Sequence, residues 1–453
     1  MNMEKSFKIK SLRVFKSMVS IVAAIAIFYG IVQVLNYMYV DPGASSKERV
    51  VWHDFYEEKG QINNLYLGAS HVYDDINPML LDAMNGQSNF NLSTSGQLPN
   101  GTFHFLREAD RYNELSHVYV ELYYYYYVKY DMVSGDERIY DEFFRTWQNS
   151  DYMKLSLNKL VYMFSIARPE QYVDLCIPFT RYRTKLGDWN YIQQTIDQKQ
   201  QEEYINYQWH SGTEEYTRKG FFSANWTYDD CNKIYRQTDV LGDDPIGETS
   251  AKYLCRTIEY CQKREIPITL FVAPIYELQL IATEHYDNYI NQVRAIAERY
   301  NVEFYDFNLA KEEYLPIQNS EYFRDIGHLN DSGADMFTAF FCEVVSGNEV
   351  NNNQYFYDSY AEKLQNTTPQ VYGIYFQTPA EEDTVRNYWV ASNRKSEMEY
   401  RIEISPEEGE EYTVQDFDEN KHFALPRGET GICAITARMK EAPDNVHTLE
   451  INF

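Results

Sequence analysis

The chain has 453 residues, enough for two or three domains, and 44% of them are hydrophobic, as in proteins that fold around a large core. Its formal net charge of −27 argues against binding to a nucleic-acid backbone, which requires clustered lysine and arginine. The 42 tyrosines leave two interpretations open, namely a surface for carbohydrate or polymer contacts, or ordinary core and sheet residues.

The first 40 residues are predicted to anchor the chain in a membrane. Residues 1–16 carry five basic side chains against one acidic side chain, and residues 17–40 contain no charged residue. A transmembrane helix needs about 20 such residues, and the basic flank favours a cytoplasmic amino terminus. A cleaved signal peptide is the competing interpretation, but its apolar region would have about 7–15 residues. We therefore expect a single-pass protein of the cell membrane, with a polar linker at residues 41–60 and the rest of the chain outside.

After the linker, apolar strands alternate with helical patterns. Five strands are predicted, at NNLYLG, SNFNLS, HVYVELYYYYY, IPITLFVAP and VEFYDF. Helices are predicted at NPMLLDAMN and over residues 102–112, 249–263, 285–300 and 332–345. This alternation indicates an α/β fold, with a parallel sheet flanked by helices in a three-layer, flavodoxin-like arrangement.

Two segments depart from that alternation. Residues from about 128 to 244 are rich in aromatic and charged side chains and mainly helical in pattern. We interpret them as a helical insertion over the carboxyl edge of the sheet, with a scaffold remote from the site as the alternative. Residues 348–369 are interpreted as a helix-bearing linker. Residues 370–453 contain short segments between turn-rich pieces, which predicts an antiparallel β-sandwich module with a binding, structural or docking role.

The residues that could carry chemistry lie where predicted strands end. LYLGASH ends the first strand with Ser70 on a turn of small residues, and DIGHLND places Asp325 and His328 just before the last helix. These residue types supply a nucleophile, a general base and a group that orients the base. Each motif is weak alone, and together they predict a catalytic site.

GASH after the first strand, NLSTSGQ after the second and D-x-x-H before the last helix resemble the SGNH (GDSL-like) hydrolase family over residues 61–347. The layout is most similar to its membrane-anchored extracytoplasmic branch, which includes the D-alanyl transfer protein of teichoic acid modification and exopolysaccharide O-acetyltransferases. The resemblance implies that Ser70 is the nucleophile, His328 the general base and Asp325 the residue that holds the imidazole. It also implies that the backbone N–H groups of Gly96 and Ser70 bind the oxyanion.

One family motif is missing from the chain. The third block of the family, usually G-x-N-D, is not found, and the third strand instead leads into Glu121 and a run of tyrosines. A carboxylate donates no hydrogen bond unless it is protonated. Gln97 and Asn91 are therefore the alternative side-chain donors to the oxyanion.

Other polar residues near these motifs have more than one interpretation. His71 follows the nucleophile and is a candidate for substrate contact. Asp74 and Asp75 are adjacent, so their side chains point in different directions, and we expect solvent-facing and helix-start roles rather than a glycosidase pair. The six cysteines form no CxxC pair, so neither a zinc site nor a redox site is expected, and the scheme requires no cofactor.

Together, the resemblance and the anchor predict a serine acyltransferase outside the membrane that modifies hydroxyl groups of an envelope or extracellular polymer. The resemblance implies two partners, a membrane-bound O-acyltransferase-type protein that supplies the acyl group and a polysaccharide or teichoic acid-like acceptor. The alternatives are an esterase that deacetylates extracellular glycans and a non-catalytic scaffold of a polymer-export complex.

Overall fold

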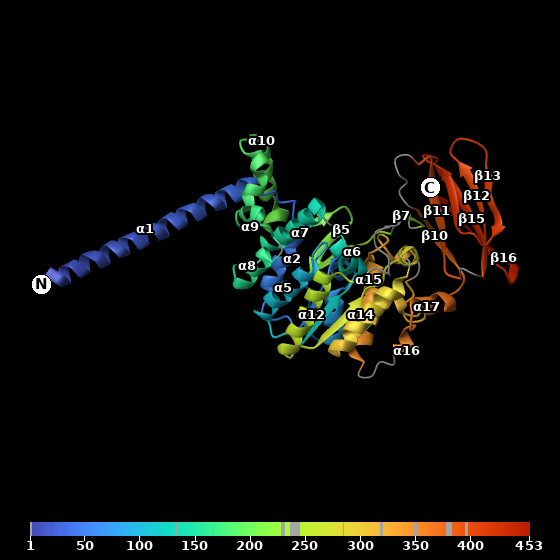
Figure 1. Ribbon diagram of the computed structural model, residues 1–453, viewed down its shortest axis with the longest axis horizontal. Coiled ribbons are helices and arrows are strands. Elements are labelled where there is room, and N and C mark those ends of the chain that lie inside the picture. The colour runs from blue at the N-terminus through green and yellow to red at the C-terminus, as the bar shows by residue number, and fades with distance from the viewer. Residues whose placement is uncertain are drawn as a thin grey trace. The chain divides into compact units, whose positions relative to one another are not determined.

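The computed structural model describes residues 2–132, 135–165, 167–227, 232–235, 245–283, 285–317, 320–347, 352–376, 383–394 and 397–453 (Figure 1). The chain forms two compact units. The smaller unit comprises Met1–Arg49 and Glu142–Trp209, and the larger comprises Val50–Asp141 and His210–Phe453.

The larger unit is built on a five-stranded parallel sheet. Its strands are β1 (Asn64–Leu67), β2 (Asn89–Asn91), β3 (His117–Glu121), β8 (Ile268–Val272) and β9 (Glu303–Asp306). They pair in the order β2-β1-β3-β8-β9, and every neighbouring pair is parallel. The predicted parallel sheet is therefore confirmed. Its order reverses beside β1, and in sheets of this kind ligands bind at the carboxyl ends of the strands next to such a reversal.

Helices pack against both faces of this sheet. Phe341 of α15 (Asp331–Ser346) makes ring contacts on one face, with Tyr66, Tyr119 and Phe271. On the opposite face, Phe90 contacts Phe55 of α2 (Ser46–Glu57). Further helices of this unit are α3 (Ser70–Asp75), α4 (Pro78–Asn85), α5 (Pro99–Asp110), α6 (Tyr124–Met132), α12 (Glu248–Lys263), α13 (Glu277–Ala282) and α14 (Tyr286–Tyr300).

The tyrosine run does not extend the third strand as predicted. β3 ends at Glu121, and the tyrosines begin helix α6 instead. The hydroxyl of Tyr124 accepts hydrogen bonds from Gln279 (2.7 Å) and Thr283 (3.1 Å) of the α13 region. These tertiary contacts outweigh the strand preference of tyrosine.

The predicted insertion is only partly helical. Its second half contains a three-stranded antiparallel sheet of β4 (His210–Ser211), β5 (Glu214–Arg218) and β6 (Phe221–Ala224). Ser223 and the backbone N–H of Ala224 donate to Asp331 at the start of α15 (2.8 and 2.7 Å). This small sheet therefore lies at the carboxyl edge of the parallel sheet. Residues 228–231 and 236–244 of the predicted insertion lie outside the described residues.

The carboxyl-terminal segment forms two four-stranded sheets, ordered β14-β11-β10-β7 and β13-β12-β15-β16. Their strands are β10 (Val371–Phe376), β11 (Val385–Ser392), β12 (Met398–Pro406), β13 (Tyr412–Asp418), β14 (His422–Pro426), β15 (Gly431–Met439) and β16 (Ala442–Asn452). Both sheets contribute to one buried core, which includes Ile374 and Tyr388 from the first sheet and Ile402 and Ile435 from the second. The predicted β-sandwich is present, with two additions. β14 was not among the predicted short segments, and β7 (Lys233–Tyr235) comes from the insertion and pairs in parallel with β10.

The predicted linker carries α16 (Asn352–Tyr355) and α17 (Tyr360–Asn366). It is not a free connection. Lys363 is buried, and its Nζ donates to Glu277 (2.7 Å) and to the carbonyl of Asn308 (2.8 Å) in the α/β region.

The smaller unit consists of the long helix α1 (Asn2–Tyr39) and a group of short helices. These are α7 (Gly135–Ser150), α8 (Leu157–Phe164), α9 (Tyr172–Cys176), α10 (Trp189–Lys199) and α11 (Glu202–Ile205). Within α1, Phe15–Tyr39 is long and apolar enough to cross a membrane, a property that signal sequences near an amino terminus share.

Candidate active site

Ser70 follows β1 directly and is the first residue of helix α3. Gly68 makes this sharp turn possible, because a Cβ there would lie 2.7 Å from both Glu121 Cβ and Val72 Cγ2. Ala69 is buried, whereas Ser70 remains partly exposed at the carboxyl edge of the sheet. The turn therefore presents the serine hydroxyl where a ligand can reach it.

The structure brings the three predicted residues together. Ser70 Oγ lies 2.7 Å from Nε2 of His328, and Nδ1 of the same ring lies 2.9 Å from both carboxylate oxygens of Asp325. The carboxylate holds a proton on Nδ1, which leaves Nε2 as the acceptor for the serine proton. This chain of hydrogen bonds is the geometry required of a nucleophile, a base and an orienting acid.

The Asp325 carboxylate is held by its own loop. Oδ1 accepts the backbone N–H groups of Gly327 (2.8 Å) and His328 (2.9 Å). Burial alone would raise the pKa of Asp325, but the hydrogen bond and charge of His328, the Gly327 N–H and Arg324 together hold that pKa far below its usual value. Asp325 is therefore ionised at any pH at which the protein would work.

Arg324, which is not among the predicted site residues, connects this loop to two other elements. Its guanidinium bonds to Asp74 of α3 at 2.5 Å and to Glu214 of β5 at 3.0 Å, and its Nε lies 3.8 Å from Asp325. The RDIGH sequence places a basic residue directly before Asp325, and this position could have indicated a role for Arg324 at the site. No sequence pattern indicated that Glu214 of the insertion would contact Arg324.

Asp74 and Asp75 do not have the roles expected from the sequence, because both side chains are buried. Asp74 pairs with Arg324, and Asp75 Oδ1 accepts the backbone N–H of Leu329 at 2.9 Å. Burial and the neighbouring charge of Asp74 raise the pKa of Asp75 well above its usual value. Both residues thus join α3 to the loop that carries His328.

His71 is buried beside the triad. Its ring stacks on His328 with a centroid separation of 4.7 Å and lies 4.2 Å from the ring of Tyr123. Among the described residues, neither ring nitrogen has a hydrogen-bond partner of normal geometry. Burial, followed by the charge of His328, lowers the pKa of His71 well below its usual value, so the ring is neutral. These contacts favour packing, and substrate contact by His71 stays a prediction.

Glu121 lies beneath the nucleophile turn. Its carboxyl group accepts the backbone N–H groups of Tyr123 and Ala69, and burial raises its pKa to about 8 despite these bonds. Oε1 has no hydrogen-bond partner among the described residues. Glu121 therefore supports the Gly68–Ser70 turn from below.

The side chains proposed as oxyanion donors are engaged elsewhere. Both amide hydrogens of Asn91 are used, in bonds to the carbonyls of Val72 (3.0 Å) and Ile76 (2.8 Å), so Asn91 secures α3 and does not serve as a donor. Gln97 Nε2 donates to Thr102 at 3.0 Å. Gly96, at φ +60°, forms the turn between β2 and α5. The backbone N–H groups of Gly96 and Ser70 thus remain as the donors to propose, together with the second amide hydrogen of Gln97.

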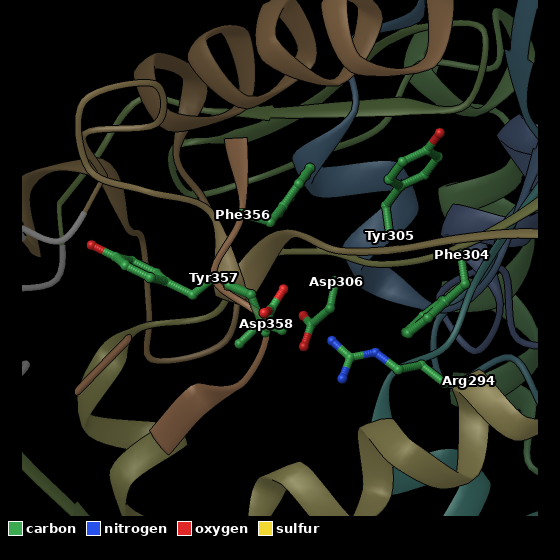
Figure 2. A pocket seen from close by; sticks show the side chains of 8 residues that line it. Arg294, Phe304, Tyr305, Asp306, Phe356, Tyr357 and Asp358 are labelled. Carbon is green, nitrogen blue, oxygen red and sulfur yellow. The ribbon is translucent and has the colours of Figure 1, made fainter. Parts of the chain in front are cut away.

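A separate cavity of about 360 Å³ lies beside β9. In Figure 2 the guanidinium of Arg294 and the carboxylates of Asp306 and Asp358 point toward one another within it. No member of the triad lines this cavity, so it is not part of the site at Ser70. Within the described residues, no group of three or more His, Cys, Asp or Glu side chains is arranged to hold a metal ion.

Comparisons with known proteins give no family for this chain. No family model matches it, and no curated protein matches it. One solved structure with a weak match is a double mutant of an endo-β-1,4-mannanase from Cellulomonas fimi. The sequences are 9% identical, the match covers 91% of this chain and 99% of that one, and the TM-score is 0.16. A similarity this low carries no argument about fold or function.

Proposed function

We propose that the chain is an SGNH-like serine acyltransferase, anchored in the membrane, that acylates hydroxyl groups of an extracytoplasmic polymer. The observation that carries the proposal is the bonded series Ser70–His328–Asp325 at the carboxyl end of β1. The strand order β2-β1-β3-β8-β9 supports it, because the order reverses beside the strand that carries the nucleophile.

In the first half of the reaction, Ser70 Oγ attacks the carbonyl carbon of the acyl donor while its proton passes to Nε2 of His328. The oxyanion would be bound by the backbone N–H groups of Ser70 and Gly96, and one well-placed donor is worth about 3–4 kcal/mol. Collapse of the tetrahedral intermediate breaks the bond to the leaving group, which takes the proton from His328. The product is an acyl ester on Ser70.

In the second half, His328 removes a proton from the acceptor hydroxyl, whose oxygen attacks the acyl ester. The Ser70–acyl bond breaks, and the proton returns from His328 to Ser70 Oγ. Asp325 keeps the imidazole in one tautomer and stabilises its positive charge in both halves. An esterase would follow the same steps with water as the acceptor.

The end of α1 supports a retained anchor rather than a cleaved signal peptide. Lys199 Nζ donates to the carbonyls of Asn36 (3.2 Å) and Tyr37 (2.8 Å), and the hydroxyl of Tyr191 donates to the carbonyl of Tyr39 (2.9 Å). Cleavage would remove the acceptors of these bonds. A cation at the carboxyl end of a helix also stabilises the helix dipole. A retained anchor holds the site near a membrane partner of the O-acyltransferase type, which would supply the acyl group.

Mass spectrometry of the envelope polymer tests this function. Cells that carry Ser70→Ala should lose an acyl mass from the polymer that cells with the unmodified chain retain. A polymer that gains acyl mass in Ser70→Ala cells would instead identify an esterase, and an unchanged polymer would favour the scaffold.

A further inference from the structure

Helix α8 has an unusual outer face. Leu157, Leu160, Val161 and Phe164 recur at helical spacing and are all exposed, with Leu157 75% accessible. The opposite face carries Met163, which packs in a buried core with Trp147 and Leu175. A surface helix normally turns polar residues outward, whereas α8 is apolar on its exposed face.

Helix α9 extends this face. The ring of Tyr172 contacts that of Phe164 edge to face at 4.9 Å, and Val173 beside it is 57% accessible. We call Leu157, Leu160, Val161, Phe164, Tyr172 and Val173 the apolar patch. A contiguous exposed patch of this kind marks an interaction surface.

The same unit contains the end of the membrane-spanning segment. The backbone N–H of Phe179, three residues after α9, donates to the side chain of Asn36 at 3.0 Å. Ala44 packs against the core that carries Met163 and Leu175. Ala44 lies five positions after Tyr39, the last residue of the span, and a chain of that length extends at most about 18 Å. The helices that carry the patch are therefore held close to where α1 would leave the bilayer.

Aromatic residues and charge at this end also suit a membrane surface. Trp189, at the start of α10, is 74% accessible and lies two residues before Tyr191, which bonds to the last residue of the span. Tryptophan and tyrosine concentrate at the level of the lipid headgroups. Residues 157–185 contain five basic and two acidic side chains, in a chain whose net charge is −27. Two of these arginines are ion-paired, yet the segment is basic enough to attract anionic lipid.

We propose that the apolar patch lies in the interface of the bilayer that holds α1, so that the helical unit is a second, monotopic membrane contact. The inference rests on the proposed anchor and does not depend on the chemistry at Ser70. Its partner is lipid, with apolar side chains between the headgroups and basic side chains near their phosphates. The contact would fix the helical unit on the membrane surface instead of leaving α1 as a single flexible tether.

Site-specific fluorescence in the full-length chain tests this contact. Cys176, Cys231 and Cys255 are replaced by serine, because the remaining cysteines, Cys261, Cys342 and Cys433, are buried. A polarity-sensitive dye is attached at Leu157→Cys or Val161→Cys, with Val446→Cys on the exposed strand β16 as the matched control. Each protein is placed in nanodiscs of phosphatidylcholine with about 30% phosphatidylglycerol, which supplies anionic charge. Some of the lipid carries a nitroxide quencher near the headgroup end of its acyl chain.

The expected result is blue-shifted emission at both patch positions and quenching about threefold stronger than at Val446→Cys, since the patch dyes lie in the interface. Equal emission and quenching at all three positions would overturn the inference. The inference would also be overturned if emission at the patch positions shifted to the blue only after a partner membrane protein is added, because the patch would then bind protein. Fluorophosphonate labelling is measured on the same dye-labelled proteins, all of which keep Ser70. Strong quenching at the patch without labelling of Ser70 would overturn only the proposed enzyme, and labelled Ser70 with solvent-exposed patch dyes would overturn only the membrane contact.

Discussion

Ser70 and His328 are 258 positions apart in the sequence, yet Ser70 Oγ lies 2.7 Å from Nε2 of His328. Asp75 helps to maintain this approach, because its carboxylate accepts the backbone N–H of Leu329, next to the histidine. Helix α3 thus positions both the nucleophile and, through Asp75, the loop that carries the base.

The first prediction concerns the orientation of the imidazole. Asp325→Asn keeps one oxygen that can accept the Gly327 and His328 N–H groups, but its amide nitrogen donates and cannot accept the proton on Nδ1 of His328. The tautomer with the proton on Nε2 is then favoured, and it cannot accept the proton of Ser70. We expect the rate of acetyl-ester cleavage to fall by about 10⁴-fold. Steady-state kinetics with p-nitrophenyl acetate measure the rate. A variant that keeps a tenth or more of the activity would contradict the assigned role.

The second prediction concerns the buried cation. Arg324→Met breaks the buried ion pair with Asp74 and removes a positive charge near Asp325, and breaking a buried pair in this way costs about 3–5 kcal/mol. Urea denaturation measures the free energy of unfolding. The matched control is Arg401→Met, because the Arg401–Glu403 pair is partly exposed, with both side chains about 40% accessible, and should contribute less than about 1 kcal/mol. Equal losses in the two variants would mean that the Arg324 network does not hold the loop.

The third prediction concerns the pH dependence of stability. Burial raises the pKa of Glu121 from 4.5 to about 8, so between these values the folded protein binds a proton that the unfolded chain has released. The stability that this group contributes therefore falls as the pH rises through that window. Glu121→Gln removes this titrating group. The melting temperature of the variant minus that of the unmodified chain should therefore be larger at pH 9 than at pH 5.

Differential scanning fluorimetry at the two pH values measures this change. The exposed Glu450 supplies the control, since Glu450→Gln should shift the melting temperature equally at both. A Glu121→Gln difference that does not depend on pH would show that Glu121 is ionised in the folded protein.

The fourth prediction separates packing from substrate contact at His71. His71→Phe preserves a flat ring between His328 and Tyr123 and removes two buried nitrogens that have no hydrogen-bond partner of normal geometry among the described residues. We expect the free energy of unfolding to rise by about 1 kcal/mol and the ester-cleavage rate to change little. A stable variant with a rate lowered a hundredfold would assign His71 to the reaction instead.

The sequence was informative where short-range patterns decide the structure. The strand before Ser70, the parallel sheet and the short D-x-x-H loop follow from apolar runs, turn residues and local spacing, and the structure contains them. The β-sandwich was also accessible, because its strands alternate buried and exposed residues, as MEYRIEI does in β12.

Long-range contacts explain what the sequence did not reveal. The tyrosines after Glu121 favour strand by composition, but their contacts with α13 make them a helix. Asp74 and Asp75 look solvent-facing in sequence, and only the fold supplies Arg324 and Leu329 as their partners. Glu214 reaches Arg324 from an insertion 110 positions earlier in the chain, which no local pattern records.

We propose that Ser70 is a nucleophile activated by His328. A fluorophosphonate probe tests this proposal most directly, because the serine oxygen must displace fluoride from phosphorus to become labelled. Intact protein mass spectrometry should find one adduct, on Ser70, and His328→Ala and Ser70→Ala should both abolish it. An unlabelled chain, or labelling of Ser70 that persists at the same rate in His328→Ala, would contradict the account.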